Sequence, residues 1–113
     1  MHIKLIATVL IVFFSSNNLL ATLKPNSITK EGYCVVDTKK QRAIGLNRFK
    51  TKQEFKKDCN GKMIFLFKKN ECRLFTMKKM NFNIFIEDTK GKSNFKIDER
   101  KIVCGKKIIE TLK

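Results

Sequence analysis

Four cysteines, Cys34, Cys59, Cys72 and Cys104, constrain the fold of this 113-residue chain more than any other feature. An even number of cysteines in a short chain with a secretory leader predicts a framework of two disulfides. A metal site needs closely spaced ligands such as C-x-x-C, whereas the intervals here are 25, 13 and 32 residues. We therefore expect two structural disulfides, each stabilising the fold by about 2–4 kcal/mol, and no metal site.

Three disulfide pairings are possible for four cysteines. Cys59 falls at the end of an expected helix, and Cys72 starts the strand after the next expected turn. We favour Cys34 with Cys104 and Cys59 with Cys72, because the second bond would tie that helix end to that strand.

Residues 1–21 have the pattern of a signal peptide. A short positive start is followed by the ten-residue apolar run from Leu5 to Phe14 and a polar step, which predicts cleavage after Ala21, with cleavage after Thr22 as the alternative. The alternative is an uncleaved anchor, which needs about 20 predominantly apolar residues. The polar residues 15–18 interrupt any such window, so the sequence predicts a cleaved leader and secretion.

The remainder divides into an amino-terminal tail at residues 22–32 and a single domain at residues 33–113. Neither a repeat nor a Ser/Gly/Pro-rich linker divides this part of the chain. A domain of this size buries a limited core, which is why the two disulfides matter for its stability.

One short helix is predicted at about residues 52–59. Thr51 and Glu54 form a capping box at its start, and Gly61 provides a stop. Phe55 and Cys59 are four residues apart, so they share a face that should point to the core.

Strand patterns account for most of the other segments. The first are a short strand at about 33–37 and an apolar run at 62–67, and a turn at 68–71 then leads into a strand at 72–77. An alternating hairpin follows at 82–97, with its turn at 88–92. The last strand runs from 101 to Cys104, and its continuation is either strand or short helix. The expected fold is α+β: a small disulfide-stabilised antiparallel sheet of four to six strands with one short helix.

Catalytic chemistry has little support in the sequence. The only histidine, His2, lies in the leader, so the mature chain lacks histidine-based acid–base pairs and histidine metal ligands. The adjacent carboxylates Glu87–Asp88 and Asp98–Glu99 are the remaining candidates, but adjacent strand residues point to opposite faces. We expect no enzyme activity, no catalytic residue and no cofactor.

Positive charge is the property left to interpret. The chain carries 25 Lys and Arg against 10 Asp and Glu, a net charge of +15, and removal of Lys4 with the leader makes it +14. Such a charge favours polyanionic partners through long-range attraction and counterion release. Lys, Ile, Phe and Asn all have AT-rich codons, so base composition is a competing explanation for part of the lysine excess.

Basic residues occur as adjacent pairs, and residues 38–43, TKKQRA, have the x-B-B-x-B-x form associated with heparin binding. The residues we expect to contact a polyanion are Lys39, Lys40, Arg42, Lys56, Lys57, Lys106 and Lys107. Nucleic acid is disfavoured as the partner because the chain is exported and lacks a recognisable reading motif.

In general format the chain resembles the small secreted effectors found in the saliva of blood-feeding insects and in venoms. The leader 1–21, the four widely spaced cysteines, the lack of histidine after the leader and TKKQRA at 38–43 carry this resemblance. In size, basicity and cysteine number it is similar to the salivary anti-complement protein of sand flies. The resemblance implies a non-enzymatic inhibitor of a host plasma cascade, complement or coagulation.

The sequence therefore predicts a secreted, basic, non-enzymatic protein that binds a host extracellular protein or an anionic polysaccharide such as a glycosaminoglycan. The alternative hypothesis is a cationic toxin or antimicrobial that acts on anionic membrane surfaces. The oligomeric state is left open.

Overall fold

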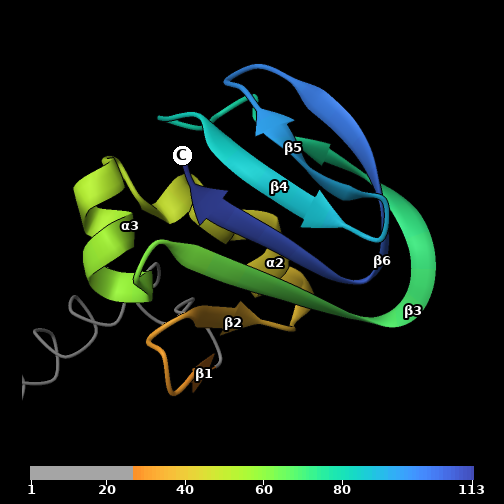
Figure 1. The fold of residues 1–113 in the computed structure, drawn as a ribbon, viewed down its shortest axis with the longest axis horizontal. Coiled ribbons are helices and arrows are strands. Elements are labelled where there is room, and N and C mark those ends of the chain that lie inside the picture. Colours follow the sequence, from red (N-terminus) through yellow and green to blue (C-terminus); the bar gives the residue numbers. More distant parts are fainter. Residues whose placement is uncertain (1–26) are drawn as a thin grey trace, which may run out of the picture.

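Six strands form one mixed sheet, and the helices lie beside its long strands (Figure 1). The structure, a computed structural model, describes residues 27–113, so the expected signal peptide at 1–21 lies outside the described residues. The elements in chain order are β1 (Ser27–Ile28), β2 (Cys34–Val36), α2 (Lys39–Ile44), the 3-10 helix η2 (Gly45–Arg48), α3 (Lys52–Cys59), β3 (Lys62–Thr76), β4 (Ile84–Asp88), β5 (Gly91–Phe95) and β6 (Arg100–Leu112).

The strand order is β1-β2-β3-β6-β4-β5. All pairs are antiparallel except β2 with β3, which run parallel with Cys34 opposite Met63. The helices between β2 and β3 carry the chain back to the same end of the sheet, and such a crossover is what parallel pairing requires. The α+β class is confirmed, while the expectation of a purely antiparallel sheet is wrong. The sheet also starts at Ser27, within the segment for which a tail is expected.

The helix α3 occupies the predicted residues, and Thr51 caps its start as expected, whereas the Glu54 carboxylate accepts from the Thr51 hydroxyl at 3.5 Å and not from the Thr51 backbone N–H. The Thr51 hydroxyl accepts a hydrogen bond of 3.2 Å from the Glu54 backbone N–H, and the helix ends at Cys59 before Asn60, which adopts the left-handed conformation. Phe55 and Cys59 are fully buried. Phe55 packs against Phe49 and Phe82, with ring centroids 5.3 and 6.1 Å apart.

A second α-helix, α2, forms where the sequence suggested only a basic motif. Thr38 caps it by accepting from the Gln41 backbone N–H at 3.2 Å. Because Thr and Gln are three residues apart, Thr38–Gln41 is the same capping pattern as Thr51–Glu54. The expectation of one short helix is therefore wrong: the described residues contain two short α-helices and a 3-10 turn.

The strand β3 is continuous through residues 68–71, where the sequence predicted a turn. Its pairing with β6 shifts between Leu66, which faces Lys107, and Glu71, which faces Gly105, so a bulge interrupts the ladder there. The strand curves strongly at this bulge (Figure 1). Phe65 and Phe75 are ten residues apart, yet their ring centroids are 5.3 Å apart, since the strand folds back on itself.

The hairpin of β4 and β5 is confirmed, with Ile84 opposite Phe95 and the turn after Asp88. The end of the chain, left open in the sequence, is strand: β6 continues to Leu112 and pairs with both β3 and β4. Ile84, Phe95 and Ile108 are fully buried between these strands and the helices.

Two disulfides are present, as expected, but they pair differently from the arrangement we favoured. Cys34 bonds to Cys59 and Cys72 bonds to Cys104. The first links β2 to the end of α3 in the core, and the second crosses between β3 and β6, where Cys72 and Cys104 are direct neighbours in register. The prediction failed because it assumed a turn at 68–71, which would have brought Cys72 back towards Cys59.

Candidate ligand-binding cleft

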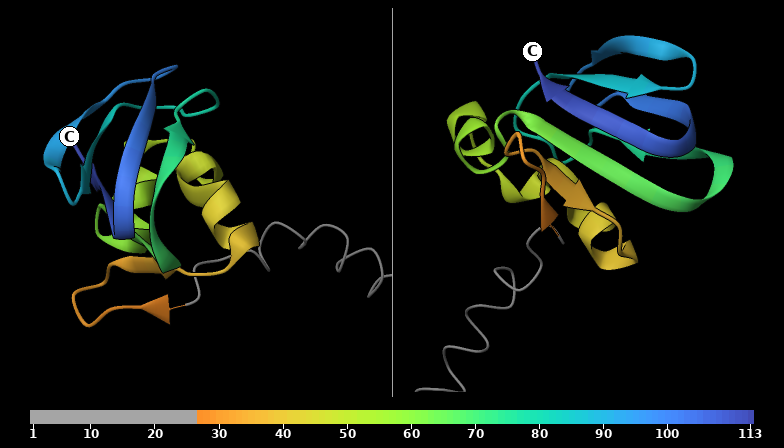
Figure 2. Two further views of the ribbon diagram at one scale, coloured as in Figure 1. Left: turned by 90° about the vertical axis from the view of Figure 1, so that its right-hand side faces the viewer. Right: turned by 60° about the horizontal axis from the view of Figure 1, so that its bottom comes forward.

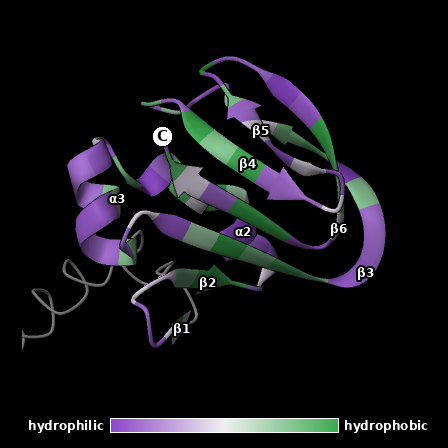
Figure 3. Ribbon diagram, viewed as in Figure 1, coloured by the Kyte–Doolittle hydropathy of each residue, from purple (hydrophilic) through white to green (hydrophobic). Residues whose placement is uncertain are grey.

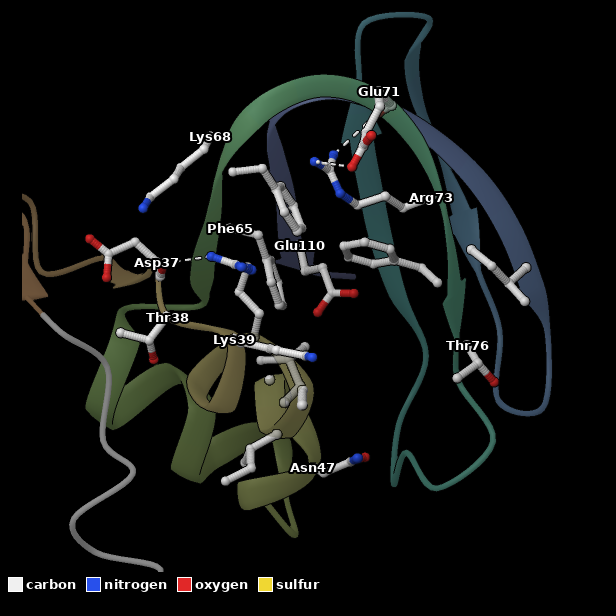
Figure 4. Close-up of a pocket in the computed structure, with 18 of the residues that line it drawn as sticks. Asp37, Thr38, Lys39, Asn47, Phe65, Lys68, Glu71, Arg73, Thr76 and Glu110 are labelled. Carbon is white, nitrogen blue, oxygen red and sulfur yellow. Dashed lines mark hydrogen bonds and ion pairs between the residues drawn. The ribbon is translucent and has the colours of Figure 1, made fainter.

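A cleft of about 1030 Å³ lies between α2, η2 and the inner side of β3. Its walls come from Lys39 to Asn47 on the helices and from Phe65 to Thr76 on the curved strand. Figure 2 shows α2 beside β3, and Figure 4 shows the cavity between them. The volume matches the upper limit of small-molecule sites, which span about 300–1,000 Å³.

Glu110 of β6 lines the cleft and is the one buried charged residue among residues 27–113. It faces Met63 on β3 and Ile86 on β4, and directly opposed residues share a face of the sheet. The Glu110 side chain therefore lies on the apolar inner face, and Figure 4 shows its carboxyl group in the cavity beside Phe65.

The Glu110 carboxyl group has no hydrogen-bond or ion-pair partner within the described part of the chain. Every fully enclosed side-chain nitrogen or oxygen there does have a partner. The carboxyl group of Glu110 is therefore not sealed in the core: the 5% of the residue that remains exposed includes it, at the cleft. Desolvation by these apolar surroundings raises the pKa of Glu110 from 4.5 to about 8.

Aromatic rings form much of the cleft wall. Phe65 and Phe67 both make edge contacts with Phe75, with centroids 5.3 and 6.2 Å apart. The guanidinium groups of Arg42 and Arg73 lie 4.6 and 3.7 Å from the Phe67 ring centroid. The rings of this cleft thus already interact with cations, as aromatic faces do.

The two arginines also hold the bulge of β3 in place. Arg73 donates to the backbone carbonyls of Lys69, Glu71 and Gly105 at 2.9–3.2 Å and forms an ion pair of 3.2 Å with the Glu71 carboxylate. Arg42 donates to the carbonyl of Leu66 at 2.9 Å and to that of Asp37. Arg42, expected on a polyanion-binding surface, is half-buried, and its guanidinium serves these internal contacts.

The lysines that the sequence singled out fall into two groups. Lys39 lines the cleft together with Lys68 and Lys69 of the bulge, and Lys40 follows Lys39 on α2. Lys106 and Lys107 lie across from the bulge on β6. We call Lys39, Lys40, Lys68, Lys69, Lys106 and Lys107 the bulge lysines. The bend that carries Lys68 and Lys69 is strongly hydrophilic in Figure 3.

The pair Lys56 and Lys57 belongs to a different part of the molecule. Both are exposed on α3, which lies at the opposite end of β3 from the bend in Figures 1 and 2. The fold therefore does not bring this pair together with the bulge lysines.

The adjacent carboxylates considered for catalysis are used in turns. The Asp88 carboxylate accepts from the backbone N–H groups of Lys90 and Cys104 at 2.9 and 2.8 Å. The Glu99 carboxylate accepts from the Lys96 N–H at 3.0 Å. Asp88 thus ties its turn to β6, Glu99 stabilises its own loop, and no hydrogen bond joins the two acids in a common site within the described residues.

Sequence reasoning missed Glu110 and Arg73 as residues of the cleft. A usable signal for Glu110 was its place in β6, where Ile108, Glu110 and Leu112 alternate on one face, so that a charged residue interrupts an apolar series. Arg73 likewise interrupts the apolar segment at 72–77, but that pattern does not indicate its partners, which are carbonyl groups at a bulge.

Within residues 27–113, no group of three or more His, Cys, Asp or Glu residues is arranged to hold a metal ion. None of the helices in this range is long and apolar enough to cross a membrane. Comparisons with protein-family models, curated proteins and solved structures find no match.

Proposed function

We propose that this protein is a secreted, non-enzymatic binding protein whose bulge lysines engage an anionic host macromolecule, with a sulfated glycosaminoglycan as the simplest representative. The observation that carries the proposal is the convergence of three Lys-Lys pairs, from α2, β3 and β6, around one bend of the sheet. The disulfides are consistent with an extracellular protein.

The charge around the bend is largely uncompensated. Among residues 27–113 the one ion pair is Arg73 with Glu71, and the bulge lysines on β3 and β6 are exposed. Exposed ammonium groups on flexible stems give point-charge attraction to a polyanion without bidentate readout, which suits a repetitive sulfated chain. Such attraction weakens as salt shortens the Debye length.

Heparin chromatography tests this proposal. We expect the wild type to elute well above physiological salt and the double reversal Lys68→Glu/Lys69→Glu to elute at clearly lower salt. The matched control is Lys56→Glu/Lys57→Glu, which makes the same change of charge on α3, away from the bend. If the bulge lysines form a local binding surface, the salt concentration at elution should fall further for the bulge variant than for the control.

Two results would contradict the proposal. Elution of the wild type at or below about 0.15 M salt, where the Debye length is about 8 Å, would show no specific affinity. Equal losses for the bulge and α3 variants would show that net charge alone retains the protein.

The resemblance to salivary effectors supports a finer proposal, that binding inhibits complement or coagulation. The same variants test it in assays of complement lysis and clotting time. We expect the wild type and the α3 variant to delay one of these reactions and the bulge variant to lose the effect. If the wild type delays neither reaction, the inhibition proposal is wrong. The proposal of polyanion binding is then still tested by the heparin experiment.

A further inference from the structure

The carboxyl group of Glu110 is an unpartnered acid in an apolar cleft on a strongly basic protein. The residue is 5% exposed, lies between Met63 and Ile86 on the inner face, and has no polar partner in the described residues. An ionised carboxylate in such surroundings is costly unless a cation compensates it. The Glu110 carboxylate therefore favours a cationic ligand over a neutral or anionic one in this cleft.

The charged side chains that share the cleft do not pair with Glu110, and its two arginines are already engaged elsewhere. Arg42 and Arg73 are used by backbone carbonyls and Phe67, and Arg73 is paired with Glu71. None of the cationic side chains forms an ion pair with Glu110. The charged groups facing the cleft from α2, its preceding loop and β3 are Asp37, Lys39, Arg42, Lys68, Lys69, Glu71 and Arg73.

The wall chemistry favours a cation of a particular kind. Phe65 and Phe75 offer ring surface next to the acid, and ring faces attract ammonium groups as Phe67 already attracts two guanidinium groups. A cleft of about 1030 Å³ also has room for an apolar body attached to the ammonium group. A neutral polar ligand needs only hydrogen bonds, which the amide of a glutamine at this position would provide as well as the carboxyl group of Glu110.

We infer that this cleft binds a small organic amine with an apolar or aromatic body, and that the Glu110 carboxylate is the counter-ion of the ammonium group. The ligand's ring or chain packs among Phe65, Phe75 and Met80, which line the cleft. This function is distinct from polyanion binding, because it uses the Glu110 carboxylate, whereas polyanion binding uses the ammonium groups of the bulge lysines, three of which line the same cleft.

Linkage between binding and protonation provides the test. The pKa of Glu110 is raised to about 8, so near pH 7 the acid is mainly protonated and must lose its proton to pair with an ammonium ion. Affinity for an amine should rise by about tenfold per pH unit from pH 6 and level off above pH 8. About one proton should be released per ligand bound at pH 7.

The probes are 2-phenylethylamine and its neutral analogue 2-phenylethanol, titrated into the full secreted chain by calorimetry. Buffers with different enthalpies of ionisation count the protons released. We expect binding of the amine with proton release, and at least tenfold weaker binding of the alcohol at pH 8.

Variants separate the carboxyl group from the fold. Glu110→Gln should lose the pH dependence and at least tenfold in affinity at pH 8. The matched control Glu87→Gln makes the same change at an exposed position of β4, next to β6, and should bind the amine like the wild type. If Glu110→Gln does not fold, the pH profile and proton count of the wild type decide the question.

Salt distinguishes this site from the polyanion surface. Salt screens the repulsion between the exposed lysines and an incoming cation more than it screens the buried ion pair, so amine affinity should hold or rise with salt while heparin affinity falls. Equal affinity for the amine and the alcohol, a flat pH profile or undiminished binding by Glu110→Gln would each overturn the inference. Loss of heparin binding alone would leave it intact.

Discussion

The side chain of Glu110 puts a proton-binding group among apolar neighbours, and this has a consequence for folding as well as for binding. In the unfolded chain its carboxyl group titrates near the ordinary value of 4.5, whereas burial raises the pKa in the folded protein to about 8. Between these values the folded state holds a proton that the unfolded state has released. Stability is therefore fully present below about pH 4.5 and declines as pH rises towards 8.

Replacement of Glu110 by Gln should remove this decline. Across pH 5–8 we expect the unfolding free energy of the wild type to fall relative to that of Glu110→Gln, by at most about 1.4 kcal/mol per pH unit, which corresponds to one proton. Urea unfolding followed by circular dichroism at several pH values measures the difference. Parallel pH curves for the two proteins would show that Glu110 ionises normally in the folded state.

The strand β3 shows how a single element can both shape and line a site. Its bulge between Leu66 and Glu71 bends the strand so that Phe65, Phe67 and Phe75 meet. The bulge exposes carbonyl groups that the ladder does not pair, and Arg42 and Arg73 bond to them from two sides. Hydrogen bonds from a charged donor are stronger than neutral ones, and these hold the bulge in one conformation, so the two arginines contribute to the strand's stability.

Truncation of Arg73 should destabilise the whole domain. Arg73→Ala removes three bonds to backbone carbonyls and the contact with Phe67, and we expect a loss of about 2 kcal/mol in unfolding free energy. Arg73→Lys keeps the charge but not the planar fork, so it should recover less than half of the loss. Chemical denaturation provides the measurement.

Arg100→Ala is the matched control, because Arg100 is exposed at the start of β6 and its side chain makes no hydrogen bond or ion pair within the described residues. It should change stability by less than about 0.5 kcal/mol. Full rescue by Arg73→Lys would contradict the role given to the guanidinium fork.

Across the whole molecule, the two disulfides link different elements and lie in different environments. Cys34 and Cys59 are 1% and 0% exposed, in the core between β2 and α3. Cys72 is exposed on β3, where it bonds to the half-buried Cys104. Thiol–disulfide exchange requires access of the attacking thiolate to a sulfur atom, so the two bonds should differ in their rate of reduction.

Mild reductant under native conditions should therefore open Cys72–Cys104 before Cys34–Cys59. Alkylation at timed intervals, followed by peptide mass mapping, identifies the cysteines released first. We expect labelling of Cys72 and Cys104 while the other pair remains closed. Simultaneous release of all four thiols would instead indicate that reduction proceeds through global unfolding.

Local patterns in the sequence were enough for the elements that depend on near neighbours. The helix at 52–59 follows from a cap and from residues four apart, and the hairpin of β4 and β5 follows from alternation on either side of a turn. Thr38–Gln41 has the same capping pattern, but the lysines between the two residues also fit a basic surface motif, so the local pattern alone does not single out a helix there.

The sequence by itself determined that the cysteines form two disulfides, that the domain is α+β and that the chain is strongly basic. Only the tertiary structure decided which cysteines pair, that β2 runs parallel to β3, and that Glu110 lies inside a cleft. The physical reason is the sequence separation of the residues that interact. A cap or an alternation is set by residues a few positions apart, whereas disulfide partners and the burial of one carboxyl group depend on strand order and on a bulge that brings distant residues together.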